Sequence, residues 1–175
     1  MSIAFEGHVQ QIGERLIVRL PAEASGALPS RGQVAVEGEL DDHPFATVLE
    51  PDGRKGHWIA IDPELRDALA LRDGEPVVGA LTPTKAWPEP ALPEDLAAAL
   101  DGAADLAETW ASLTPMARWE WVRWVKATKN PETRARRVEV SLSKLRDGKR
   151  RPCCFDLSSC TDPEVSKSGK LIDLG

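Results

Sequence analysis

Basic and aromatic side chains gather in one stretch of this sequence, residues 114–151, and their types could bind an anionic partner. The stretch holds three of the six Trp and carries 12 Lys and Arg against 4 Asp and Glu, whereas residues 1–113 carry 8 against 20. Such a segment either pairs with the protein's own acidic half or offers a cationic face to phosphates and carboxylates. The candidate anion- or partner-binding residues are Lys126, Lys129, Arg134, Arg136, Arg137, Lys144, Trp119, Trp121 and Trp124.

These nine side chains have two interpretations. In the first, the cations contact phosphates while the indoles stack on bases or form cation–π contacts, as in a nucleic-acid-binding protein. In the second, the residues form a helical hairpin whose tryptophans are core and whose cations pair with the acidic barrel or with water. The second interpretation is favoured, because Trp at helical spacing is usually buried and surface cations are usually solvated.

Two shorter motifs could also meet an anion. Glu132, Thr133 and Arg134 place a carboxylate, a hydroxyl and a guanidinium together, although the same residues suit the first turn of a helix. The loop at residues 53–57 could offer backbone N–H groups to an anion. It lacks the length and the Lys-Ser/Thr ending of a phosphate-binding loop, so a hairpin turn is favoured.

The three cysteines, Cys153, Cys154 and Cys160, lie in the C-terminal tail. Adjacent cysteines without a nearby His do not match the ligand spacing of zinc sites, so no cofactor is expected and a metal at these cysteines is the alternative. The sequence also lacks a Gly-x-Ser-x-Gly nucleophile motif, and its three His have no signalled catalytic partner. A non-enzymatic protein is favoured over an enzyme acting on a small anionic ligand.

The residues ahead of the basic segment predict strands and turns. Short apolar, β-branched runs alternate there with Gly, Pro and Asp. A weak repeat, at an offset of about 41 residues, aligns the segment from Ile17 with that from Trp58, and each copy predicts strand, Pro-initiated helical turn and strand. Two such units close a barrel without exposed sheet edges. The six expected strands are 3–10, 15–20, 33–40, 44–49, 57–61 and 76–81.

The residues after this half predict a linker and then helices. Residues 82–93 contain four prolines and no periodicity. Beyond them, capping residues and glycines delimit about four helices, the last with an apolar stripe of Ala135, Val138, Leu142 and Leu145. We therefore expect an α+β protein with a barrel domain at 1–82, a Pro-rich linker at 83–92, a helical domain with the basic hairpin at 93–150 and a Cys-containing tail at 151–175.

The hydropathy pattern predicts where the chain is located and whether it inserts into a membrane. No apolar run approaches the ~20 residues that a membrane-spanning helix needs, and the N-terminus lacks the features of a signal peptide. We expect a cytoplasmic protein with no membrane insertion. The oligomeric state is not encoded in any recognisable pattern.

Several motifs resemble those of a bacterial family, the YdeI/OmpD-associated or bacteriocin-protection type. They are Phe5-x-Gly7, Leu20-Pro21, the turn ending Gly56-His57-Trp58, Leu92-Pro93-x-Asp95-Leu96, Leu113-Thr114-Pro115 and Trp124-x-x-x-Thr128-Lys129-x-x-Glu132-Thr133-Arg134-x-Arg136-Arg137. Thr128 stands where the family usually has Ala. The resemblance implies an N-terminal β-barrel of unknown function (domain of unknown function 1905), a helical C-terminal part and a role in bacteriocin protection, with no established reaction to transfer.

The repeat unit is also similar to that of AbrB-type swapped-hairpin DNA binders, but the acidic balance of residues 1–113 disfavours DNA contact by this half. The sequence thus favours a cytoplasmic, non-enzymatic binding protein that recognises a peptide or protein through a groove between barrel and helices. Nucleic-acid binding by the basic hairpin is the first alternative.

Overall fold

The computed structural model describes residues 1–152, 162–167 and 170–172, and divides them into two compact units. Residues 1–88 and 170–172 form the first unit, and residues 89–152 and 162–167 form the second. Among these described residues, no helix combines the length and the apolar character required to cross a bilayer.

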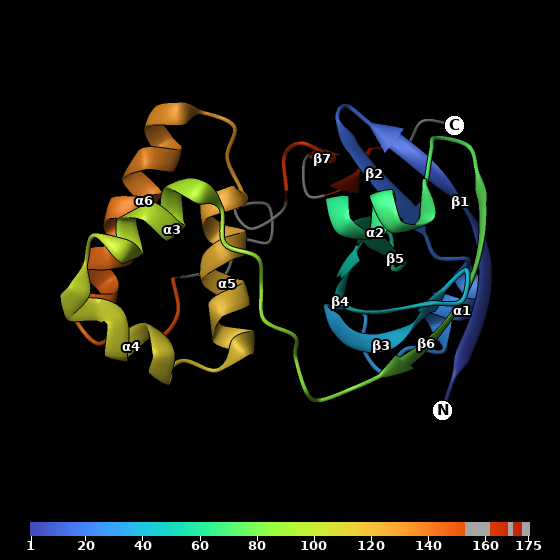
Figure 1. The fold of residues 1–175 in the computed structure, drawn as a ribbon, viewed down its shortest axis with the longest axis horizontal. Helices are drawn as coiled ribbons and strands as arrows, with labels where there is room; N and C mark the ends of the chain where they lie inside the picture. The colour runs from blue at the N-terminus through green and yellow to red at the C-terminus, as the bar shows by residue number, and fades with distance from the viewer. Residues whose placement is uncertain (153–161, 168–169, 173–175) are drawn as a thin grey trace. The chain divides into compact units, whose positions relative to one another are not determined.

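The first unit is a closed antiparallel barrel of six strands (Figure 1). Around the barrel the strands follow the order β1-β2-β5-β4-β3-β6, and β6 pairs with β1 to close it. This architecture confirms the barrel that the sequence predicts. The strands are β1 (Ile3–Ile12), β2 (Arg15–Arg19), β3 (Val34–Leu40), β4 (His43–Pro51), β5 (His57–Ile61) and β6 (Pro76–Pro83).

The internal repeat appears as two strand–helix–strand units in the barrel. The first is β2, α1 (Ala22–Gly26) and β3, and the second is β5, α2 (Pro63–Leu69) and β6. Each strand pairs antiparallel with its counterpart in the other copy, β2 with β5 and β3 with β6. The repeat therefore builds the barrel as two interlocked halves, which is why neither half presents a complete sheet.

The barrel interior is filled by the inward side chains that the strand alternation selects. One continuous cluster includes buried residues from all six strands together with Ala24 and Leu65 of the two helices. The helices thus cover the barrel interior with their apolar sides. Fully buried members of the cluster are Val9, Val18, Val36, Leu40, Leu49, Ile59 and Leu81.

The second unit is mainly helical in its described part. Its elements are α3 (Glu94–Asp101), the 3₁₀ turn η1 (Ala104–Leu106), α4 (Ala107–Ser112), α5 (Pro115–Lys126) and α6 (Pro131–Arg146). The predicted caps set two helix starts: the Thr114 side chain accepts from the Ala117 N–H at 3.1 Å, and the Asn130 side chain accepts from the Glu132 N–H at 2.9 Å. Pro follows each cap residue at the first helical position, where its missing N–H costs nothing.

Helix α6 packs with an apolar face that differs in part from the predicted stripe. Val138 and Leu145 are buried and Leu142 is partly buried, as predicted. Ala135 is exposed, and the buried polar residue on this face is Ser141, whose hydroxyl donates to the Arg137 carbonyl oxygen at 2.7 Å. A Ser that bonds within its own helix is tolerated in a buried position because its polar atom is satisfied.

Two short strands lie near the C-terminal end of the chain. Strand β7 (Ser166–Lys167) belongs to the second unit, and strand β8 (Lys170–Leu171) belongs to the first.

Candidate functional site

The three tryptophans of α5 occupy different environments. Trp121 is fully buried in the cluster with Leu106, Leu113 and Leu145, and its indole N–H donates to the Arg150 carbonyl oxygen at 3.2 Å. Trp119 and Trp124 are half-buried. Trp121 is therefore a core residue, since an indole that buries its ring and satisfies its N–H has nothing left for a ligand.

Trp124 is the centre of a cation–aromatic cluster between α5 and α6. The guanidinium carbon of Arg137 lies 5.3 Å from the centroid of the Trp124 ring, and the Lys144 ammonium lies 5.2 Å from it. Arg137 also donates to the Trp124 carbonyl oxygen at 2.8 Å, and Lys144 donates to the Pro152 carbonyl oxygen. These three predicted site residues do come together, but they bind one another and hold the hairpin closed.

Arg134 forms a bidentate ion pair with Asp95, which lies in the first turn of α3. The Nε and Nη2 groups of Arg134 donate to the two carboxylate oxygens at 2.6 and 3.1 Å. This hydrogen bonding lowers the pKa of Asp95 below its ordinary value and raises that of Arg134. The pair joins α6 to α3, so the guanidinium that sequence analysis offered to an external anion already has a carboxylate.

Further cations of the basic segment bond to acceptors inside the helical unit. Arg146 pairs with Asp105 at 2.8 Å, Arg151 pairs with Glu120 at 2.8 Å, and Arg150 donates to the Ser112 carbonyl oxygen at 2.9 Å. At least seven of the twelve basic residues at 114–151 thus have a partner within this unit: Arg118, Arg134, Arg137, Lys144, Arg146, Arg150 and Arg151.

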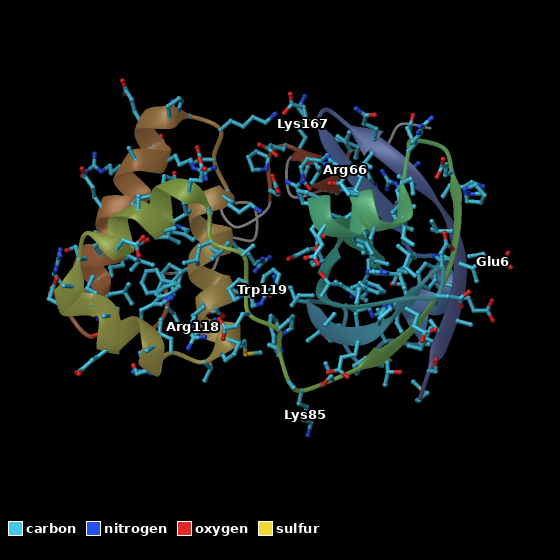
Figure 2. The ribbon with its side chains drawn as sticks, viewed as in Figure 1. Glu6, Arg66, Lys85, Arg118, Trp119 and Lys167 are labelled. Carbon is cyan, nitrogen blue, oxygen red and sulfur yellow. The ribbon has the colours of Figure 1, made fainter. Side chains whose placement is uncertain are left out.

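Arg118 bonds to four residues of the helical unit, and no sequence pattern pointed to it. It pairs with Glu89 and also donates to the carbonyl oxygens of Trp110 at 3.2 Å, Ala111 at 3.1 Å and Leu113 at 2.6 Å. Figure 2 shows Arg118 on the side of α5 that faces α4, with Trp119 on the opposite side. A usable signal exists: helix α4 ends just before α5 and leaves carbonyl groups that a cation can cap.

Part of the basic segment is exposed along the outer face of α6. Lys129, ahead of the helix, and Arg136, on it, are exposed. A shallow, open hollow follows this face, which we call the α6 outer face, and it is lined by Glu132, Ala135, Arg136, Glu139, Val140 and Ser143. The face is mixed in character, because two small apolar side chains lie among charges of both signs.

The two shorter motifs are structural. Glu132 and Thr133 begin α6, where their N–H groups are capped by Asn130. In the loop before β5, the Asp52 carboxylate accepts the N–H groups of Arg54 at 2.7 Å and Gly56 at 2.9 Å. The loop's own carboxylate thus takes the donors that an external anion would need, and the residues form the turn that the sequence favours.

His57 is buried, and both its ring nitrogens have partners. Nε2 lies 2.8 Å from the Gly32 carbonyl oxygen, so it donates, and Nδ1 therefore accepts from the Ser25 hydroxyl at 2.5 Å. Burial lowers the pKa of His57, which keeps the ring neutral. With both Ser25 and His57 almost completely buried, this pair stabilises the barrel and does not present a nucleophile.

Metal ligation has no support in the part of the chain that the structure describes, where no three His, Cys, Asp or Glu side chains gather as a metal site would require. The proposed ligands Cys153, Cys154 and Cys160 lie outside the described residues. A metal at the tail therefore stays an untested alternative.

The fold and the site define a class: a two-part protein that joins a small closed antiparallel barrel to a helical unit with an internally bonded basic hairpin. Residues 89–148 match the family described as Bacteriocin-protection, YdeI or OmpD-Associated, and residues 5–79 match the Domain of unknown function (DUF1905). The helical part of the chain is therefore similar to the YdeI/OmpD-associated family, and its barrel is similar to this domain of unknown function. Among the curated proteins, none matches the chain.

Proposed function

We propose that this protein is a non-enzymatic binding protein of the bacteriocin-protection type that recognises a peptide or protein partner. The observation that carries the proposal is that most arginines of the basic segment bond to acceptors of their own unit, as in the Arg134–Asp95 and Arg146–Asp105 pairs. A segment organised in this way stabilises a scaffold, and among the described residues the mixed α6 outer face offers an exposed surface to a partner. The family description supports an association with bacteriocin protection.

The α6 outer face suits a polypeptide better than a phosphate backbone. Glu132 and Glu139 flank Arg136 on the same face, so their carboxylates repel a polyanion. A peptide can instead place an acidic group on Arg136, basic groups on the two glutamates and a small apolar side chain over Ala135 and Val140. Complementary charges around an apolar centre are the usual arrangement of a protein interface.

Nucleic-acid binding is the competing function, and it needs cations that are free to meet phosphates. Arg134, Arg137 and Lys144 would have to give up the Asp95 carboxylate or backbone carbonyl groups first. Each exchange replaces one charge-assisted hydrogen bond with another, so the net gain is small. This cost disfavours the alternative for the described part of the segment.

The proposal is tested by selecting peptides that bind the full chain. A displayed peptide library is panned on the wild-type protein and counter-selected on the Arg136→Glu/Glu139→Lys variant, and the enriched peptides are titrated by calorimetry. We expect micromolar peptides that bind this variant about tenfold more weakly, which corresponds to about 1.4 kcal/mol.

Arg66→Glu is the matched control, because Arg66 is also exposed but lies on helix α2 of the barrel unit (Figure 2). Peptide affinity should be unchanged in this variant. The proposal is overturned when no peptide is enriched, or when enriched peptides bind both charge variants and the wild type equally well.

A further inference from the structure

The described C-terminal residues of the chain lie against the barrel of the first unit. The Leu171 N–H donates to the Asp52 carbonyl oxygen at 3.0 Å, and Arg54 Nη1 donates back to the Leu171 carbonyl oxygen at 2.7 Å. Arg19 donates to the carbonyl oxygen of Ile172, and Leu171 itself is 1% exposed. A short segment far along the sequence is thus held by three hydrogen bonds and one buried leucine.

The barrel side of this contact is preorganised by bonds of its own. The Asp52 carboxylate holds the N–H groups of Arg54 and Gly56, and the Asp52 N–H donates to the Gly56 carbonyl oxygen at 3.0 Å. A Cβ atom on Gly56 would lie 2.5 Å from an Asp52 carboxylate oxygen, so a larger residue there would displace the carboxylate that holds this turn. Arg19 is fixed in turn by its Nε, which donates to Gln10 Oε1 at 2.8 Å.

The chemistry of these contacts indicates the kind of ligand they recognise. All three hydrogen bonds go to main-chain atoms of the C-terminal segment, and none goes to its side chains. Contacts of this kind suit an extended polypeptide that offers one N–H and two carbonyl groups at this spacing, and the burial of Leu171 favours a leucine at its position. Recognition of main chain by hydrogen bonds and of alternate side chains by burial is the general mode of extended-peptide binding.

We propose that Arg19, Asp52 and Arg54 form a binding site for an extended, leucine-containing peptide segment of a partner, and that residues 170–172 occupy this site as an intramolecular competitor. The site lies on the barrel and uses none of the residues of the α6 outer face. It goes beyond the proposed function, and either proposal can fail while the other stands.

Competition from residues 170–172 determines how much more weakly a free peptide binds to the wild-type chain. A tethered segment competes at an effective concentration on the order of 1 mM. A free peptide with an intrinsic dissociation constant of about 10 μM would therefore bind the wild-type chain about a hundredfold more weakly than a chain whose own segment is released.

The test uses a fluorescent peptide with the sequence of residues 167–175, Lys-Ser-Gly-Lys-Leu-Ile-Asp-Leu-Gly, and the full chain carrying Leu171→Asp. The substitution places a charge at the buried anchor and releases the internal segment. Fluorescence anisotropy should show binding to this variant at least about tenfold tighter than to the wild type, within the range set by the competition above. Adding Arg54→Ala to the variant should remove the binding, and a peptide with Asp in place of its first Leu should not bind.

A second variant guards against a folding defect. When circular dichroism shows that Leu171→Asp impairs the fold, the chain ending at Lys167 serves for the same titration, since it lacks the internal competitor altogether. The proposal is overturned when a folded released variant does not bind the peptide, or when its affinity equals that of the wild type and of the Arg54→Ala double variant.

Discussion

Replacing Arg118 with Met tests how far the basic segment stabilises the helical unit. The change keeps much of the aliphatic stem and removes the guanidinium. That group bonds to Glu89 and to the carbonyl oxygens of Trp110, Ala111 and Leu113. Its side chain is only 14% exposed, so water does not fully replace these bonds.

The expected cost follows from the number and kind of these contacts. A hydrogen bond to a charged group contributes about 1.5–3 kcal/mol, while carbonyl groups at the end of α4 recover part of this by hydration. We expect Arg118→Met to lower the free energy of unfolding by about 2–4 kcal/mol. This is a large part of the roughly 5–15 kcal/mol that stabilises a typical domain.

Urea unfolding followed by far-ultraviolet circular dichroism measures this loss. Arg136→Met is the matched control, because Arg136 is also an arginine of the basic segment but is exposed on α6. It should change stability by no more than about 0.5 kcal/mol. Equal effects of the two substitutions, or a loss below about 0.5 kcal/mol for Arg118→Met, would refute the argument that the buried cation acts as a helix cap.

Three further outcomes follow from other contacts. A double-mutant cycle on Asp95→Asn and Arg134→Ala should give a coupling free energy of about 0.5–1 kcal/mol at pH 7, because the pair is partly exposed. The bond to Arg134 lowers the pKa of Asp95, so the coupling measured in further cycles should decrease as the pH drops below about 4. Burial lowers the pKa of His57, so at low pH the unfolded chain takes up a proton that the folded protein does not. Urea titrations should therefore show the free energy of unfolding falling as the pH drops below about 6.5. His57→Gln should reduce this dependence of the unfolding free energy on pH. Gly38→Ala places a Cβ atom 2.0 Å from a carbonyl oxygen of β6 and should cost more than about 2 kcal/mol in thermal or urea unfolding, whereas Gly26→Ala, which meets nothing within 4 Å, should be nearly neutral.

Local signals account for the elements that the sequence predicts well. Thr114-Pro115 and Asn130-Pro131 start α5 and α6 in the structure, and the repeat from Ile17 and Trp58 gives two strand–helix–strand units. These features depend on neighbouring residues and backbone geometry, which the sequence contains directly. The closed barrel follows from them, because six strands with apolar alternation need a way to bury their edges.

The candidate site depends on which residues meet in three dimensions, and local patterns do not contain that information. The basic count of residues 114–151 indicates a cationic segment, but not that Arg134 meets Asp95 on another helix or that Arg137 lies over Trp124. Ala135 fits the helical stripe and is nevertheless exposed, because the packing partner of α6 covers a different arc of the helix. Contacts with sequence separations of 39 residues, as in the Arg134–Asp95 pair, need the folded chain to reveal them.

The contacts of the C-terminal segment, residues 170–172, are likewise not predictable from local sequence patterns. Residues 170–172 have no period that predicts an ordered element, yet Leu171 is buried and its main chain is bonded to the barrel. The hydrogen bonds come from Arg54 and Arg19, more than a hundred residues earlier in the chain. Only tertiary structure makes such a segment a candidate ligand for its own barrel.

The affinity of the full chain for a 20-base-pair DNA duplex at 50 and 200 mM salt tests most directly whether the cations of the basic hairpin are held by their own unit. We expect no saturable binding tighter than about 100 μM at either salt concentration, because most arginines of the basic hairpin, Arg134 and Arg137 among them, already bond to acceptors of their own unit. Micromolar binding that weakens about a thousandfold between the two salt concentrations, and that Arg134→Glu/Arg137→Glu abolishes in a folded protein, would contradict this expectation.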